Sequence, residues 1–240
     1  MSRARRFEGG EFMILGIDSS AISAGCALVD GGKIVSEGFL NTSHTHSETL
    51  LPMVKDVLKN AGAEFSDIEK IAVTVGPGSF TGLRIGISAV KGLCFGTGVP
   101  CVSVSTLEAI AYNFLGIDGI ICACMDARVG QIYNALFRSE NGVITRLCED
   151  RALSLSELSA ELEILSKEHE RIFLAGDGAA IVDGFTDGKY TLSPPALRFQ
   201  RGSGVCFAAA NSPTVEAAAL MPKYLRLPQA ERERLARQDS

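Results

Sequence analysis

A single glycine-rich stretch limits the folds open to this chain more than any other feature. Residues 76–86 read Gly-Pro-Gly-Ser-Phe-Thr-Gly-Leu-Arg-Ile-Gly. The residues before them, 71–75, form a short apolar run that predicts a strand buried on both faces, and residues 81–97 predict a helix. A glycine loop between a buried strand and a helix is typical of α/β folds, in which the first N–H groups of the helix can bind an anion.

The loop departs from two common phosphate-binding patterns. A P-loop requires Gly-Lys followed by Ser or Thr, and this loop contains no lysine. The dinucleotide-binding fingerprint requires a third glycine where Thr81 stands. Two interpretations therefore stay open: the loop binds an anion through Gly76, Gly78, Ser79 and Thr81, or it is a tight turn in which Thr81 caps the helix.

Alternating strand and helix patterns predict two related α/β halves. The first part is expected to run strand, strand, strand, helix, strand, helix, strand, helix over 12–17, 23–29, 33–40, 46–61, 71–75, 81–97, 99–104 and 106–115. The second part repeats this order in reduced form, with strands over 120–125, 131–137, 143–147 and 171–175 and helices over 156–165, 205–210 and 215–220.

These patterns divide the chain into parts. We expect a first domain over 13–115 and a smaller second domain over 116–212. A C-terminal helix over 213–227 is expected to cross back to the first domain. Residues 1–12 read as a frayed extension, and residues 228–240 as a charged tail.

Composition and charge narrow the function classes. The 240 residues are 46% hydrophobic and 21% charged, and the net charge is -5. Such an acidic chain is poorly suited to bind a nucleic acid alone, because phosphate neutralisation dominates nucleic-acid affinity. No window approaches the roughly 20 apolar residues of a membrane span. The 7 cysteines are scattered and lie mostly in apolar runs, which favours reduced thiols and a cytoplasmic protein.

Several motifs of the chain resemble those of one known family. The glycine loop, residues 14–20 and residues 46–52 closely resemble the TsaB family, a glycoprotease-like group of paralogues of TsaD. Asp126-Ala127-Arg128, Gln131-Ile132-Tyr133 and Tyr224-Leu225-Arg226 continue the match in the expected order. The resemblance spans 13–226 and implies the duplicated, ribonuclease H-like α/β fold of actin, hexokinase and the heat-shock ATPases (ASKHA), with the second half reduced.

The resemblance also implies a function and partners. A TsaB-type subunit would be a non-catalytic scaffold for threonylcarbamoyl transfer to the adenosine next to the anticodon of ANN-decoding tRNAs. It would pair with the catalytic subunit TsaD, be joined by the ATPase TsaE, form a homodimer when alone, and touch tRNA only indirectly. No cofactor is expected in this chain, with ATP or ADP possible at the complex and a metal only in TsaD.

Groups that would carry catalysis are hard to assemble from these residues. TsaD-like relatives hold a metal through two histidines on one helix, whereas His44 and His46 would point about 200° apart on a helix, and the third histidine is His169. ATPases of the fold place a carboxylate where Asp18 stands, so Asp18 and Ser19 join the possible nucleotide site; the alternative is a hydrogen-bonded turn.

Two alternative functions follow from the same fold. One is an enzyme, either an ATPase or kinase-like phosphotransferase or a peptidase. A serine peptidase is not supported, because Ser79 does not stand in a Gly-x-Ser-x-Gly motif. The other alternative is a module that binds tRNA directly, which the net charge disfavours.

Two helices predict a surface for a partner. On the helix over 81–97, one face is apolar, and Ile85 and Ala89 with glycines lie on the opposite side. A helix that is apolar nearly all round needs cover on both sides. The predicted interface consists of Leu51, Val54, Leu58, Arg84, Ile85, Ser88, Ala89 and Gly92. The alternative is that the two helices only cover each other and the sheet.

Overall fold

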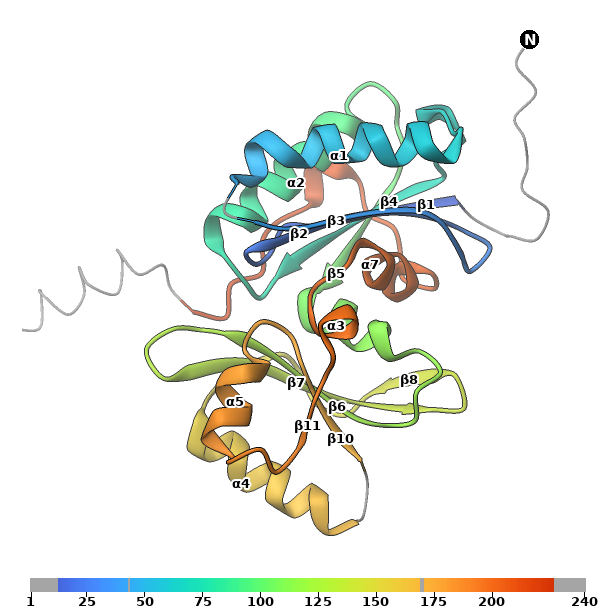
Figure 1. Ribbon diagram of the computed structural model, residues 1–240. Coiled ribbons are helices and arrows are strands. Elements are labelled where there is room, and N and C mark those ends of the chain that lie inside the picture. Colours follow the sequence, from blue (N-terminus) through green and yellow to red (C-terminus); the bar gives the residue numbers. More distant parts are fainter. Residues whose placement is uncertain (1–12, 43, 169–170, 227–240) are drawn as a thin grey trace, which may run out of the picture.

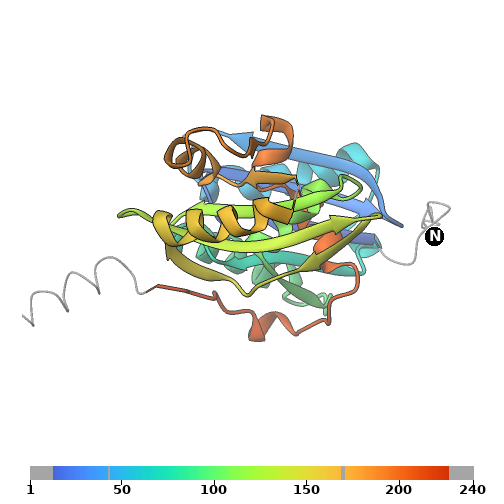
Figure 2. The same cartoon turned by 90° about the horizontal axis from the view of Figure 1, so that it is seen from below.

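The computed structural model describes residues 13–42, 44–168 and 171–226, which form two α/β halves, each built on one sheet (Figure 1). The halves lie one above the other, with α3 and α7 between the two sheets (Figure 1), so that the second half lies in front of the first when the molecule is seen from below (Figure 2). The predictions for residues 1–12 and 228–240 fall outside the described residues. No described helix is both long enough and apolar enough to cross a membrane.

The first sheet has the strand order β3-β2-β1-β4-β5. The antiparallel strands are β1 (Met13–Asp18), β2 (Ser23–Asp30) and β3 (Lys33–Asn41). The strands β4 (Lys70–Gly76) and β5 (Cys101–Ser105) run parallel to β1. Every residue of β1 and β4 is buried, as expected for strands that helices cover on both faces.

Helices cover both faces of this sheet. One face carries α1 (His46–Ala61) and α2 (Phe80–Cys94), with the short 3-10 helix η1 (Phe65–Asp67) between them (Figure 1). The other carries α3 (Thr106–Ala111), which continues into the 3-10 helix η2 (Tyr112–Phe114). The predicted boundary at 115/116 lies between η2 and the first strand of the second sheet.

The second sheet repeats the first in the order β8-β7-β6-β10-β11. Its strands are β6 (Gly119–Asp126), β7 (Gln131–Glu140), β8 (Val143–Arg146), β10 (Ile172–Ala175) and β11 (Thr191–Leu192), with β9 (Arg151–Ser154) added on β7. Again the first three strands are antiparallel and the last two run parallel to the first. The two halves are therefore a structural duplication, as the sequence patterns predicted.

The second half is reduced at its edge and in its helices. Its last strand has 2 residues against 5 in β5. Its helices α4 (Leu155–Leu165) and α5 (Ala179–Phe185) have 11 and 7 residues, against 16 and 15 in α1 and α2. The 3-10 helix η3 (Ser166–Glu168) and the single turn α6 (Pro195–Arg198) complete it.

The helix that crosses back to the first sheet is α7 (Gly202–Ala209). It packs directly on backbone, because a Cβ atom added to Gly202 would lie 2.4 Å from the amide nitrogen of Ala27. A Cβ atom on Gly16 would likewise lie 2.4 Å from the carbonyl oxygen of Gly202. Because Gly202 in α7 and Gly16 in β1 both lack a side chain, the backbone of α7 packs directly against the backbones of β1 and β2.

The prediction of a C-terminal helix over 213–227 is wrong for its described residues. In the C-terminal segment, 213–226, only the 3-10 helix η4 (Ala217–Ala219) is helical. The apolar residues that suggested a helix make tertiary contacts instead. Val215 pairs with Cys101 at the edge of β5, and Leu220 is buried in the hydrophobic core of the first half. Tertiary contacts here override the helical pattern.

The C-terminal segment runs along α2 and ends at the interface of the two halves. Lys91 donates a hydrogen bond to the carbonyl oxygen of Ala218 (3.3 Å) near one end of α2. The amide of Lys223 donates to the carbonyl oxygen of Val75 (2.7 Å) near the other. The segment therefore covers the edge of α2 that carries Lys91.

Candidate functional site

A cleft of about 400 Å³ lies between the two halves. Its walls are the turn after β1, the glycine loop, the end of β6 with its turn, and the last described residues. The lining residues are Ser20, Ala21, Ile22, Gly78, Ser79, Phe80, Met125, Asp126, Ala127, Arg128, Tyr133, Asp177 and Arg226.

The duplication places equivalent elements on both sides of the cleft. Asp18 is the last residue of β1, and Asp126 is the last residue of the corresponding strand β6. The glycine loop follows β4, and Gly176-Asp177-Gly178 follows the corresponding strand β10. The carboxyl ends of central strands are where α/β sheets place ligands, so this cleft is the candidate site of the fold.

Asp18 is fully buried and its carboxylate is used locally. Its Oδ1 accepts hydrogen bonds from the amide and the hydroxyl of Ser20, both at 3.1 Å. Burial raises the pKa of Asp18, and the hydrogen bonds from Ser20 act against this rise. The carboxylate of Asp18 therefore has the hydrogen-bond partners of a turn residue, as in the alternative given for it in the sequence analysis.

The glycine loop packs tightly against the turn after β1. The amide of Ser79 donates to the carbonyl oxygen of Ser20 (2.7 Å), and the hydroxyl of Ser19 donates to the carbonyl oxygen of Gly82 (2.9 Å). A Cβ atom on Gly78 would lie 2.4 Å from the carbonyl oxygen of Ser20. Hydrogen-bonding groups of Ser19 and Ser79 are thus used inside the protein.

Ser79, and not Thr81, caps α2. The hydroxyl of Ser79 accepts a hydrogen bond from the amide of Gly82 (3.2 Å), which is a standard N-cap contact. Thr81 is an exposed residue of the first turn. Of the two interpretations left open for this loop, the capped turn is present with Ser79 as its capping residue in place of Thr81. Anion binding stays a prediction. At Gly76, an added Cβ atom would lie 2.3 Å from the carbonyl oxygen of Lys223. The absence of a side chain at this position therefore leaves room for the backbone of the C-terminal segment.

The histidines have different surroundings. Nε2 of His46 lies 2.7 Å from the carbonyl oxygen of Ala21 and therefore donates to it. His44 is exposed, and His169 lies outside the described residues. Within 13–42, 44–168 and 171–226, no group of three or more His, Cys, Asp or Glu side chains is placed to hold a metal ion.

Sequence reasoning missed a polar bridge between the two halves, which joins the cleft residue Asp177 to the first sheet. Nε2 of Gln200 donates to Oδ1 of Asp177 (3.0 Å), and Oε1 of Gln200 accepts from the hydroxyl of Ser23 (3.3 Å). Burial raises the pKa of Asp177 to about 6, and the carboxylates of Asp126 and Asp18 add to this rise. The turn Gly176-Asp177-Gly178 after a strand was the only local signal for Asp177.

Three of the motifs that carry the family resemblance lie close together at the cleft. The ring of Tyr224 lies 4.3 Å from the ring of Phe80, measured between centroids, and its hydroxyl accepts from Nε of Arg84 (2.9 Å). Arg226 donates to the carbonyl oxygens of Ala127 and Arg128. The C-terminal motif thus contacts both the glycine loop with its helix and the turn after β6.

The predicted partner interface is exposed except at one residue. Arg84, Ser88 and Gly92 are exposed, Leu51 is 49% exposed, and Leu58, Ile85 and Ala89 are half-buried. Val54 is only 3% exposed, and its inclusion was wrong, because it lies one turn from Leu50 on the core side of α1. The remaining seven residues are called the α1–α2 face below.

Comparison with known proteins gives concordant matches. The sequence model of the family described as "TsaD: tRNA N6-adenosine threonylcarbamoyltransferase" matches residues 40–232. The chain is 30% identical over 222 residues to the tRNA threonylcarbamoyladenosine biosynthesis protein TsaB of Bacillus subtilis, covering 91% of this chain and 96% of that protein. It is 39% identical over 133 residues to the Escherichia coli TsaB, covering 54% of this chain and 57% of that protein.

A solved structure also resembles this one. YeaZ from Pseudomonas aeruginosa superimposes with a TM-score of 0.72 at 27% sequence identity. The match covers 90% of this chain and 100% of that chain.

Proposed function

Because the chain belongs to the TsaB family of tRNA threonylcarbamoyladenosine biosynthesis proteins, we propose that it is a non-catalytic scaffold that pairs with a catalytic TsaD subunit. Its fold is the duplicated ASKHA fold with a reduced second half, as expected from the sequence. Its role in tRNA threonylcarbamoyladenosine synthesis follows from family membership. The scaffold role and the partner are the proposal.

The state of the cleft supports a role without catalysis. Catalytic groups need polar atoms that are free to meet a substrate. Here the carboxylate of Asp18 accepts from Ser20, and the amide of Ser79 donates to the carbonyl oxygen of Ser20. Nucleotide is therefore proposed to bind at the complex and not on the glycine loop of this chain.

The α1–α2 face is the observation that carries the proposal. Small side chains line the outer side of α2, where a Cβ atom added to Gly92 would meet no atom within 4 Å. Leu51, from α1, adds a half-exposed apolar side chain to this face. Small residues let a second helix approach closely, and apolar side chains at the centre of an interface supply binding free energy.

The further parts of the proposal concern the assembly. TsaE would join the pair, the α1–α2 face would self-associate when TsaD is absent, and tRNA would be bound by the partner, in keeping with the net charge of -5. All 7 cysteines are free thiols, which fits a reducing cytoplasm.

Two glycine substitutions test the interface with a matched control. Gly92→Arg places a long charged side chain on the α1–α2 face, and Gly184→Arg does the same on α5. Both glycines are helical and have open space around an added Cβ atom. Gly92→Arg should weaken copurification with TsaD at least about tenfold, because a buried unpaired charge costs several kcal/mol. Gly184→Arg should bind as the wild type does.

The two variants are compared by affinity copurification with TsaD and by threonylcarbamoyl transfer to tRNA in the reconstituted system. Thermal unfolding shows that both fold. Equal binding by a folded Gly92→Arg variant would remove the proposed interface. Transfer at the full rate without this chain would remove the scaffold role itself.

A further inference from the structure

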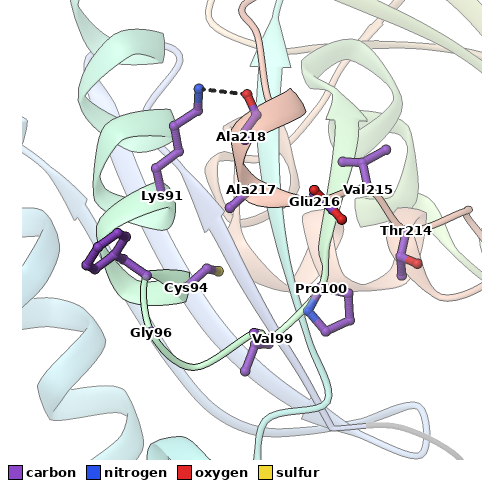
Figure 3. Close-up of a pocket in the computed structure, with 12 residues that line it drawn as sticks. Lys91, Cys94, Gly96, Val99, Pro100, Thr214, Val215, Glu216, Ala217 and Ala218 are labelled. Carbon is purple, nitrogen blue, oxygen red and sulfur yellow. Dashed lines mark hydrogen bonds between the residues drawn. The ribbon is translucent and has the colours of Figure 1, made fainter.

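A cavity of about 660 Å³ that is open to solvent lies at the far end of α2 from the cleft (Figure 3). Its walls are the end of α2, the loop leading to β5 and the C-terminal segment. Its apolar lining includes Cys94, Val99, Pro100, Val215 and Ala217. The family activity assigns no role to this cavity.

Two thiols meet beside this cavity. Cys94 is the last residue of α2 and Cys101 the first residue of β5, and their sulfur atoms are 3.3 Å apart. Cys94 lines the cavity and is 5% exposed, whereas Cys101 is fully buried. A disulfide requires a sulfur separation of about 2.05 Å. The two sulfur atoms would therefore need to approach by little more than about 1 Å.

A second pair of thiols provides an internal comparison. The sulfur atoms of Cys122 and Cys124 are 3.4 Å apart, but both residues are fully buried in the core that α4 and α5 cover. They also lie two positions apart on one strand, with only Ala123 between them, which places their Cα atoms about 6.6 Å apart, near the upper limit for a disulfide. The two pairs thus have similar sulfur–sulfur distances, but only the pair of Cys94 and Cys101 has a member that lines a cavity.

We propose that Cys94 and Cys101 are a reversible dithiol–disulfide site, which a small peroxide reaches through the cavity at the end of α2. Cys94 loses its thiol proton, and its thiolate sulfur attacks one peroxide oxygen, so that the O–O bond breaks and a sulfenic acid forms. The leaving hydroxide takes up the released proton and becomes water. The Cys101 sulfur then displaces the sulfenic oxygen, which leaves as water. In sum, two thiols and one hydrogen peroxide give one disulfide and two waters, and a dithiol reductant restores both thiols.

The reaction at this site is slow at neutral pH. Burial raises the pKa of the Cys94 thiol, and burial together with Cys94 raises the pKa of Cys101 to about 12. Since the thiolate is the attacking species, only a small fraction of either group is reactive at any moment. Exposure to peroxide for hours, and not seconds, is therefore the relevant experiment.

The test uses the full chain and compares the two pairs in one sample. The protein is exposed to hydrogen peroxide, catalase removes the excess, and free thiols are alkylated after unfolding in denaturant. Peptide mass spectrometry should find Cys94 joined to Cys101 with two hydrogens lost, while Cys122 and Cys124 are alkylated. Dithiothreitol should remove the link, and Cys101→Ser should prevent it.

A separate variant tests whether peroxide reaches the two thiols through the cavity. Ala217→Trp fills the cavity without changing either thiol, and it should slow formation of the disulfide several-fold. Full alkylation of Cys94 and Cys101 after prolonged exposure would overturn the proposal. Oxidation of both pairs at the same rate would also overturn it, because unfolding of the chain would then be the route to the thiols.

Discussion

Nε2 of His46 donates a hydrogen bond to the carbonyl oxygen of Ala21 across 2.7 Å. The first residue of α1 thereby holds the turn that follows β1, and the same turn packs on the glycine loop through Ser20. One of the histidines that the sequence analysis considered as a metal ligand is thus hydrogen-bonded to a backbone carbonyl.

Removal of this contact should destabilise the fold. His46→Ala leaves the carbonyl oxygen of Ala21 without its partner, and an unpaired part-buried acceptor costs about 1–3 kcal/mol. His44→Ala is the control, because His44 is exposed two residues earlier. Urea unfolding measures both free energies, and similar values for the two variants would contradict the structural role given to His46.

The crossing helix α7 should not tolerate a methyl group at its first residue. A Cβ atom on Gly202 would lie 2.4 Å from the amide nitrogen of Ala27, so the helix must move off the sheet. Gly202→Ala should lower the free energy of unfolding by about 2 kcal/mol or more. Gly184→Ala, in the last turn of α5 with open space around the added Cβ atom, should instead raise it by about 0.5 kcal/mol. The same sign for both would show that α7 does not pack as described.

The stability of the fold should depend on pH through Asp177. Its pKa is raised by burial from 3.8 to about 6, so folding favours the protonated form. The stabilising contribution is therefore full below about pH 4 and is lost as the pH rises through about 6. The two-unit shift corresponds to at most about 3 kcal/mol.

Asp177→Asn removes this titration while keeping an oxygen that accepts from Gln200. Its free energy of unfolding, relative to the wild type, should increase between pH 4 and pH 7, as measured by urea unfolding at several pH values. Parallel pH profiles would show that Asp177 is not buried as described.

The C-terminal segment should detach when Tyr224 loses its ring. Tyr224→Ala removes the contact with Phe80 and the hydrogen bond from Arg84, whereas Tyr224→Phe removes only the latter. An aromatic pair contributes about 0.5–1.5 kcal/mol beyond burial. Hydrogen exchange at the amide of Lys223 should therefore be clearly faster in Tyr224→Ala and close to wild type in Tyr224→Phe. Unchanged exchange in both would show that the ring does not hold the segment.

Much of the fold could be predicted from local patterns. The hairpin at 23–40 and the strand and helix on either side of the glycine loop were read correctly, because turn glycines and apolar runs are local signals. Residues 215–220 were predicted to be helical from their local pattern alone. In the structure Val215 instead pairs with the edge of β5.

The candidate site was less accessible to sequence reasoning. The Gln200 side chain joins Ser23 to Asp177, and these residues are far apart in the chain with no shared motif. The cap of α2 was misassigned because Ser79 and Thr81 are both good N-cap residues, and only the position of the first turn separates them. Val54 was placed on the interface because α1 has a broad apolar face whose buried part depends on the sheet beneath it.

The glycine contacts of α7 have a mechanical consequence. Enzymes that close on a ligand need two bodies free to rotate about a few hinge residues. Here α7 packs against the backbone of β1 and β2, and Gln200, two residues before it, is hydrogen-bonded to Ser23 in the first half and to Asp177 in the second. We therefore expect the two halves to turn as one block, so that a partner meets a preformed shape and little ordering entropy is lost on association.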